Sequence, residues 1–581
     1  MQEAAQRFSR VPSHRLLQCV CAVTAFACVH SYAQQPPSAG EVLREIQDKP
    51  KIAPSRPAPT IEVAPESRRA VKPVPGLKID VKAFRFSGLS VESEDRLQAV
   101  VQKFKGPDKT FDDLQAAADA VSEYLQQQGY FVAQAFLPEQ KIENGVVEIA
   151  VLEGRLAEVK VEMEEGAKVS RRTIDAMLSS LTPGTILHRD TVERALFLLS
   201  DLRGIAVRSI VEPGAKPGTS NLVVKISPGK RIDASIEFDN HGSRFTGEYR
   251  LGGSLDVNSP LGRGDLLSFR GLVGVPGGGR NLDFGRVSYL TPVGGYGTKL
   301  GVAYSTLRYH LGTATFESLD QGGDADVLSV FGLHPVIRTR NLNLFAQASF
   351  DARKFHDTIE SVALVSDKKT KVGTVGVVGD TRDALFGGGI NNFSLGYTAG
   401  KLDIETPVIL NADQVTGRGT QGNYSRVNGS IARLNALAES TVVFVSYSFQ
   451  LASKNLDVSE KLGLGGPNAV RAYAIGEASA DEAQLLTAEV RYGLPRFASV
   501  PGTAVVSAFF DIGHGKLNRA PTASDTGTNT RTLSGAGLGL TWGRQDDFLV
   551  RGSLAWRLSG APVSDPADRR PRLFLQFAKY L

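Results

Sequence analysis

The chain is short of cysteine and of long hydrophobic runs. Its 581 residues include 3 cysteines, and Cys19, Cys21 and Cys28 all lie within the first 33 residues. Without that segment the chain has no thiol for a disulfide or a thiolate metal site. Beyond it, no run approaches the ~18 apolar residues that a membrane-spanning helix needs. The sequence therefore excludes a disulfide-stapled domain and a helical membrane protein.

The chain also lacks a strong charge of either sign. It has 66 Lys and Arg against 61 Asp and Glu, a balance that gives no indication of a nucleic-acid partner. Its 8 histidines are scattered, and we find no G-x-S-x-G, H-E-x-x-H, paired-carboxylate or P-loop arrangement. The sequence thus predicts no enzyme, no catalytic residues, no metal site and no cofactor.

The first 33 residues have the order of a secretory signal peptide. Three arginines precede the apolar stretch 16–29, and the small-x-small triplet 31–33 follows it. Because a basic start, an apolar stretch and a cleavage site occur in this order in signal peptides, we expect segment 1–33 to be removed on export. A buried N-terminal helix is the alternative.

A short amphipathic helix is predicted in segment 34–48. Ser38 and Glu41 have the spacing of a capping box, and apolar residues follow at helical spacing. These apolar residues are Val42, Leu43 and Ile46. A frayed terminal helix without a role is the alternative.

Segment 49–76 separates this helix from the rest of the chain. It contains seven prolines and little periodic hydrophobicity. Such a composition is typical of an extended, semi-rigid linker. The predicted helix would therefore be tethered rather than fixed by its sequence neighbours.

Two segments of about 75 residues repeat one order of predicted elements. Residues 77–155 and 156–230 each read as a strand, two helices and two strands, from the alternation and helical periodicity of their apolar residues. In the first segment the strands are 79–86, 131–137 and 145–152, and the helices are 90–104 and 111–128. In the second the strands are 159–163, 207–212 and 221–226, and the helices are 170–181 and 189–202. We predict tandem βααββ modules.

From residue 231 to 581 the pattern is all-β with a period of two. Leu554, Trp556 and Leu558, for example, alternate with polar or small residues. In a soluble sandwich the apolar face points inward, whereas in a membrane barrel it faces lipid and the interior is polar. The segment is long enough for sixteen strands of ~10 residues with their loops, and closure leaves no unpaired edge in the hydrocarbon. We predict a 16-stranded antiparallel transmembrane β-barrel, with a secreted β-protein as the alternative.

Short motifs occur in a fixed order along the chain after residue 33. Gly129-Tyr130 and the run 151–154 end the first module, and the runs 239–242 and 261–265 begin the β region. Together they resemble the transporters of two-partner secretion, of the haemolysin-activator and filamentous-haemagglutinin-transporter type. The resemblance implies two POTRA domains, in 77–155 and 156–230, a barrel in 231–581, and a plug formed by the N-terminal helix.

The sharpest motif lies at 465–473 and is similar to the loop-six element of this superfamily, usually Val-Arg-Gly-Tyr. Its residues here are Gly465, Gly466, Val470, Arg471, Ala472 and Tyr473, and Ala472 replaces a glycine, the residue that most easily adopts positive φ. A second motif, Phe-x-Asp-x-Gly, is carried by Phe509, Asp511 and Gly513.

A physical argument connects the two motifs. An arginine on a loop that folds back into a barrel needs a fixed acceptor, and a carboxylate accepts from it bidentately. Phe509, Asp511 and Gly513 share one face of a predicted strand, which we expect to point into the lumen. We therefore expect an Arg471–Asp511 pair. A solvated extracellular loop is the alternative.

The resemblance implies a pore that passes a large unfolded partner protein, of the adhesin or cytolysin type, from the periplasm to the cell surface. The client would bind the POTRA domains, and the plug helix and loop six would control the pore. The protein would be a monomer in the lipid of the outer membrane, inserted by the barrel-assembly machinery. An insertion factor of the same superfamily and a passive porin are the alternatives.

Overall fold

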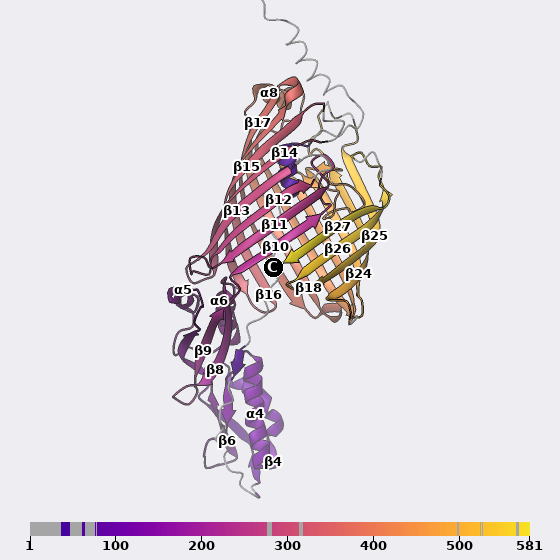
Figure 1. The fold of residues 1–581 in the computed structure, drawn as a ribbon. Coiled ribbons are helices and arrows are strands. Elements are labelled where there is room, and N and C mark those ends of the chain that lie inside the picture. Colours follow the sequence, from indigo (N-terminus) through magenta and orange to yellow (C-terminus); the bar gives the residue numbers. More distant parts are fainter. Residues whose placement is uncertain are drawn as a thin grey trace, which may run out of the picture.

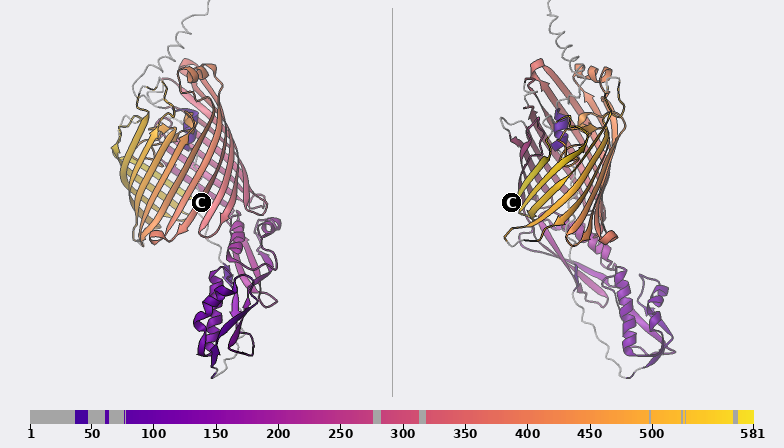
Figure 2. Two further views of the ribbon diagram at one scale, coloured as in Figure 1. Left: turned by 180° about the vertical axis from the view of Figure 1, so that it is seen from behind. Right: turned by 90° about the vertical axis from the view of Figure 1, so that its right-hand side faces the viewer.

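The computed structural model describes residues 37–46, 61–63, 76, 78–275, 282–312, 318–496, 499–522, 525, 527–564 and 569–581. The predicted signal peptide and most of the proline-rich linker lie outside these residues. Two small α/β modules lie at one end of a large barrel (Figure 1), and a short helix lies within the outline of the barrel in both views of Figure 2. No helix among the described residues is long and apolar enough to cross a membrane.

The first module has the predicted βααββ order, except that its first strand is interrupted after Val81 and a short unpredicted strand, Gly106–Lys109, lies between its two helices. Its longest helix begins at a complete capping box, in which Thr110 and Asp113 satisfy each other's backbone N–H groups. These hydrogen bonds from Thr110 hold the pKa of the Asp113 carboxyl below its usual range. The helix packs on the sheet β3-β6-β5 through small and branched apolar residues. The elements are β2 (Ile79–Val81), β3 (Ala83–Ser87), α3 (Glu94–Val101), η1 (Gln102–Phe104), β4 (Gly106–Lys109), α4 (Phe111–Gln127), β5 (Gln134–Phe136) and β6 (Val146–Leu152).

The second module repeats this order and gains one strand from the linker. Its sheet has the order β1-β8-β9-β7, in which β1 (Ile61–Val63) pairs in parallel with β8, and Glu62 lies opposite Ile210. This strand was not predicted, because three residues are too few to establish an alternation. The other elements are β7 (Arg155–Met163), α5 (Arg171–Met177), α6 (Arg189–Ser200), β8 (Ile205–Pro213) and β9 (Thr219–Pro228).

The second module is fixed to the barrel by polar contacts. The Arg338 guanidinium donates to both carboxylate oxygens of Asp201 at 3.0 Å, and it lies over the Phe197 ring at 4.5 Å. Arg340 pairs with Glu193 at 2.8 Å. Arg338 is the last residue of the barrel strand 321–338, and Arg340 lies in the turn after it. Glu193 and Asp201 belong to the second module, so these pairs join the module to the barrel.

Sixteen antiparallel strands form a closed barrel, which confirms the predicted fold class. The first and last strands close it, with Ser235 opposite Tyr580 and Asp239 opposite Gln576. The strands are β10 (Ile232–Asp239), β11 (Tyr249–Asn258), β12 (Leu266–Val275), β13 (Leu282–Val293), β14 (Thr298–His310), β15 (Gln321–Arg338), β16 (Leu342–Ile359), β17 (Leu364–Asp383), β18 (Gly389–Ile404), β19 (Gly422–Ala438), β20 (Thr441–Ala452), β23 (Glu482–Gly493), β24 (Thr503–Lys516), β25 (Thr530–Arg544), β26 (Phe548–Ser559) and β27 (Arg572–Tyr580).

Short elements occupy the loops of the barrel. Loop six, which we define as residues 453–481 between β20 and β23, contains a 3₁₀ turn and a small two-stranded sheet. The short elements are η2 (Glu360–Val362), η3 (Leu385–Gly387), α8 (Pro407–Val415), η4 (Val458–Glu460), β21 (Leu462–Gly463) and β22 (Ser479–Ala480).

The side chains of the wall alternate between its two faces. On β24, Phe509 and Asp511 are buried while Phe510 between them is exposed, as expected for one face toward the lumen and one toward lipid. The interior is not polar throughout, however. Leu272, Phe284 and Leu307 point inward and are buried in one apolar cluster with the N-terminal helix, because that helix brings its own apolar face into the lumen.

Candidate functional site in the barrel lumen

Helix α2 (Ala39–Ile46) lies inside the barrel against β14, β15 and β16 (Figure 2). Its predicted apolar residues Val42, Leu43 and Ile46 are all buried there. They pack on inward-facing apolar side chains of the wall. The apolar face of this short amphipathic helix is therefore buried against the inner wall of the barrel.

The capping-box spacing of Ser38 and Glu41 is not used. The Glu41 carboxylate instead accepts from Arg44 at 3.3 Å, one turn further along the helix. The first N–H of the helix, that of Ala39, donates to Asp357 of β16 at 2.7 Å. A negative carboxylate near the N-terminus of a helix also interacts favourably with the positive end of the helix dipole. The barrel wall therefore supplies the N-terminal cap that the sequence analysis had assigned to Ser38 and Glu41.

Arg44 connects the other side of α2 to loop six. Its Nη1 donates to the carbonyl oxygens of Val458 at 2.9 Å and Lys461 at 3.2 Å. A Cβ on Gly40 would lie 2.9 Å from Cβ of Ser459, so the helix backbone touches the η4 turn directly. Helix α2 therefore lies between the wall and loop six.

The motif of loop six folds back onto the barrel wall. Gly465 is bridged to Val470, and the N–H of Val470 donates to the carbonyl of Leu464 at 3.0 Å. Gly466 has φ +116°, and a Cβ on Gly465 would meet the Ala474 carbonyl at 2.4 Å. Both glycines are thus required by the tight turn that presents Arg471.

Arg471 makes the predicted contact with Asp511 in bidentate form. Its Nε and Nη2 donate to the two carboxylate oxygens at 2.8 and 2.9 Å, and its backbone N–H donates to the same carboxylate at 3.2 Å. The guanidinium carbon lies 3.3 Å from the centroid of the Phe509 ring. A Cβ on Gly513 would lie 3.1 Å from the Val470 side chain, so each residue of the Phe-x-Asp-x-Gly motif meets loop six.

Ala472 and Tyr473 complete the motif. Ala472 is not among the described non-glycine residues with positive φ, so the alanine meets no backbone strain at this position. It packs against β25, where a Cβ on Gly535 would lie 2.4 Å from that of Ala472. The Tyr473 hydroxyl donates to the carbonyl of Gly560 at 3.0 Å. These contacts attach loop six to β25 and to the residue after β26, on the side of β24 away from β23.

Sequence reasoning missed one other partner of Arg471 and one of Asp511. Glu489 of β23 accepts from its Nη1 at 3.1 Å, and the Thr487 hydroxyl donates to Asp511 at 2.9 Å. It also missed three charged residues near the start of loop six, Asp457, Glu460 and Lys461, which are buried in the lumen. The sequence carried a signal for Thr487 and Glu489 alone, because both occupy the polar, inward-facing positions of the alternating strand β23. The three charged loop residues lie outside any such alternation.

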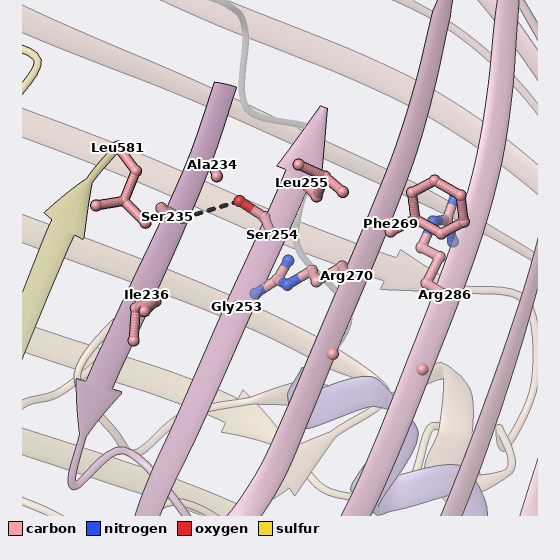
Figure 3. Close-up of a pocket in the computed structure, with 12 residues that line it drawn as sticks. Ala234, Ser235, Ile236, Gly253, Ser254, Leu255, Phe269, Arg270, Arg286 and Leu581 are labelled. Carbon is pink, nitrogen blue, oxygen red and sulfur yellow. Dashed lines mark hydrogen bonds between the residues drawn. The ribbon is translucent and has the colours of Figure 1, made fainter. Parts of the chain in front are cut away.

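A hollow of about 530 Å³ lies elsewhere on the barrel, at strands β10 to β13 (Figure 3). Gly253, Gly271 and Gly285 lie side by side on adjacent strands there, and the absent side chains create the space. Ser235 and Ser254 share a hydrogen bond of 2.8 Å at its border. The residues that line it include none from α2 or loop six, so the hollow is separate from the luminal site. Within the described residues, no group of three or more His, Cys, Asp and Glu is placed to hold a metal ion.

Comparisons with known proteins agree with this architecture. The profile described as "Haemolysin secretion/activation protein ShlB/FhaC/HecB" matches residues 218–542, and "POTRA domain, ShlB-type" matches residues 79–154. The chain is 30% identical over 467 residues to the heme/hemopexin transporter protein HuxB of Haemophilus influenzae, covering 79% of this chain and 80% of HuxB. It is 26% identical over 439 residues to the outer membrane transporter CdiB of Escherichia coli, covering 74% and 70%.

Solved structures show the same fold. CdiB from Escherichia coli superposes with a TM-score of 0.67 at 19% identity, covering 99% of this chain and 100% of CdiB. CdiB from Acinetobacter baumannii gives a TM-score of 0.59 at 17% identity, covering 98% of each chain. With its family profile, its POTRA domain and its closed barrel, this chain belongs to the haemolysin secretion/activation (ShlB/FhaC/HecB) family, the outer-membrane transporters of two-partner secretion with POTRA domains in the periplasm.

Proposed function

We propose that the chain secretes a large unfolded client through its barrel lumen, and that helix α2 plugs the lumen until the client arrives. The observation that carries the proposal is the packing of α2 against inward-facing apolar residues of β14 to β16. The helix is only eight residues long, and it is joined to the POTRA domains through a proline-rich segment. Such a helix can leave the lumen without unfolding the barrel.

Loop six has a complementary role in this proposal. The bidentate Arg471–Asp511 pair, with Asp511 only 1% exposed, fixes the loop inside the lumen on the side of β24. We propose that this pair maintains the wall in the form that a client passes through. The motif residues, Gly465 to Tyr473 and Phe509 to Gly513, are then positioning residues rather than a binding site.

Client capture is proposed at the first POTRA domain. Among the described strands, β5 pairs only with β6, and its outer residue Phe136 is 39% exposed. An extended peptide can add to such an edge through main-chain hydrogen bonds. The equivalent edge of the second module, on β8, already pairs with β1 of the linker. The difference between the two edges favours the first module as the initial capture site.

No catalytic step is needed for this transport. We propose that folding of the client outside the cell removes the exported part from the equilibrium and so gives the process its direction. The exposed apolar band of the wall fits outer-membrane lipid, and we propose a monomer inserted by the barrel-assembly machinery. An adhesin or cytolysin is the proposed client class. One relative is named as a heme/hemopexin transporter protein, which adds a client related to heme/hemopexin as a candidate.

Deletion of residues 38–48 tests the plug. We expect the deleted protein to show at least tenfold higher mean conductance than the full chain in planar bilayers, because the lumen loses its apolar filling. The matched variant V42S/L43S/I46S should act in the same direction, since each buried aliphatic side chain contributes about 1.5–3 kcal/mol of burial free energy. Unchanged conductance in both proteins would remove the plug from the mechanism. Co-expression with the product of the neighbouring reading frame, followed by assay of that product at the cell surface, tests secretion itself.

A further inference from the structure

We propose that residues 457–461 form a clasp that holds helix α2 and loop six together in the closed lumen, with Glu460 as its central positioning residue. The clasp is separate from the Arg471–Asp511 pair, which lies further along the same loop. The inference rests on the proposed role of α2 as a plug, and it adds the contact that must open before the plug can leave.

Glu460 joins the clasp to two strands of the wall at once. Its carboxylate accepts from Arg353 Nη1 of β16 at 2.7 Å and from Arg426 Nε of β19 at 3.0 Å. The residue is only 2% exposed. Because each oxygen is engaged by a different strand, one side chain fixes the position of the η4 turn relative to both strands.

The neighbours of Glu460 repeat this arrangement with other partners. Asp457 pairs with Lys368 of β17 at 2.9 Å. Lys461 pairs with Asp481, the last residue of loop six, at 2.9 Å, and both side chains are almost fully buried. The second pair closes the base of the loop. Each buried charge of the clasp therefore has an opposite charge beside it, as a stable buried network requires.

Helix α2 depends on the position of this clasp. The hydrogen bonds from Arg44 end on backbone carbonyls of Val458 and Lys461, on either side of Glu460. The close contact between Gly40 and Ser459 adds the same segment to the helix surface. If the η4 turn moves, α2 loses both acceptors and this contact together. A single displacement can therefore release the plug while Arg471 stays on Asp511.

Removal of the Glu460 charge is the direct way to open the clasp. Glu460→Gln leaves Arg353 with Asp351, its remaining carboxylate partner at 2.9 Å, and weakens the tie to Arg426. Arg44→Met opens the same contact from the helix side and changes no residue of the wall. Asp383→Asn is the matched control, because Asp383 of β17 pairs with Arg433 of β19 at 2.7 Å and touches neither α2 nor the clasp.

The experiment uses the full chain in planar bilayers. We expect Glu460→Gln and Arg44→Met to raise the mean conductance at least fivefold over the unchanged chain, and Asp383→Asn to stay within twofold of it. Heat-modifiable migration in gels shows that each barrel has folded. If Glu460→Gln fails that check, Arg44→Met decides alone, because it leaves the wall intact.

A second readout follows the helix itself. Since the chain has no cysteine after residue 28, Leu43→Cys gives a single thiol once segment 1–33 is removed, at a position that is 2% exposed. A maleimide reagent should label it at least fivefold faster when Glu460→Gln is also present. If deletion of 38–48 raises conductance but neither clasp variant changes conductance or labelling, the clasp is wrong and the plug stands. If the deletion has no effect either, the proposed plug fails together with the clasp.

Discussion

Arg471 uses both edges and the face of its guanidinium. One edge donates to Asp511, the remaining Nη1 donates to Glu489, and the plane covers the Phe509 ring. Lysine has a single compact charge and cannot make this set of contacts. The geometry therefore explains why a guanidinium, and not merely a positive charge, suits this position.

Substitution of Arg471 should separate secretion from barrel insertion. We expect Arg471→Ala to reduce secretion of the client at least tenfold, and Arg471→Lys to restore little of it, because the bidentate contact is lost in both. Surface assay of a co-expressed client, with heat-modifiable migration of the barrel, measures the two properties. Arg491→Ala is the control, since Arg491 pairs with Glu489 but not with loop six. Secretion at the unchanged level in Arg471→Ala would refute the role of the loop.

The two POTRA sheets differ in whether a further strand pairs with the edge strand that follows the second helix. The β8 edge carries the linker strand β1 in register with residues 209–211, whereas β5 of the first domain has β6 alone as its partner among the described strands. Open strand edges in soluble proteins are usually covered or charged. An apolar edge with Phe136 exposed therefore indicates a surface that a partner covers.

A substitution on the β5 edge should weaken client binding. We expect Phe136→Ser to lower the affinity of the full chain for the client about tenfold, which corresponds to about 1.4 kcal/mol. Titration calorimetry in detergent with a purified client fragment measures the dissociation constant. Met163→Ser is the matched control, because Met163 is 40% exposed on β7, the opposite edge of the second module. Equal affinities for the two variants would place the capture site elsewhere.

At the scale of the whole molecule, the second POTRA domain and the barrel share a buried polar interface. Arg338 is 3% exposed and donates to Asp201 through two nitrogens. The Lys299 ammonium adds a hydrogen bond to the Asp201 carbonyl at 2.9 Å. A rigid junction of this kind would pass a displacement of the second domain directly to the wall around loop six and α2.

Loss of the Arg338 side chain should loosen this junction. Truncating one partner of a buried ion pair costs about 3–5 kcal/mol, and we expect Arg338→Ala to fall near 3 because Asp201 retains contact with water. Limited proteolysis of the purified protein should cut between the domain and the barrel at least tenfold faster. Lys225→Ala is the control, because Lys225 and Glu162 form an exposed pair that contributes little. Equal cleavage rates would show that apolar packing alone holds the junction.

Local patterns in the sequence determined the class of most elements, but not of the short elements β1, β4 and α8. The period of two after residue 231 predicted the barrel, and the helical periodicity of Val42, Leu43 and Ile46 predicted α2. The Arg471 and Asp511 motifs predicted their own pairing, but through resemblance to a family and not through spacing. In each case the pattern is formed by residues close together in the sequence, whose side chains lie on one face of an element and so share one environment.

Only the tertiary structure decided which environment that is. The apolar patch of Leu272, Phe284 and Leu307 departs from a polar lumen because α2 lies against it. The cap of α2 comes from Asp357, 318 residues away, and Glu460 finds its partners 107 and 34 residues away. No local pattern records such pairs, because closing the barrel is what brings these charges within hydrogen-bonding distance.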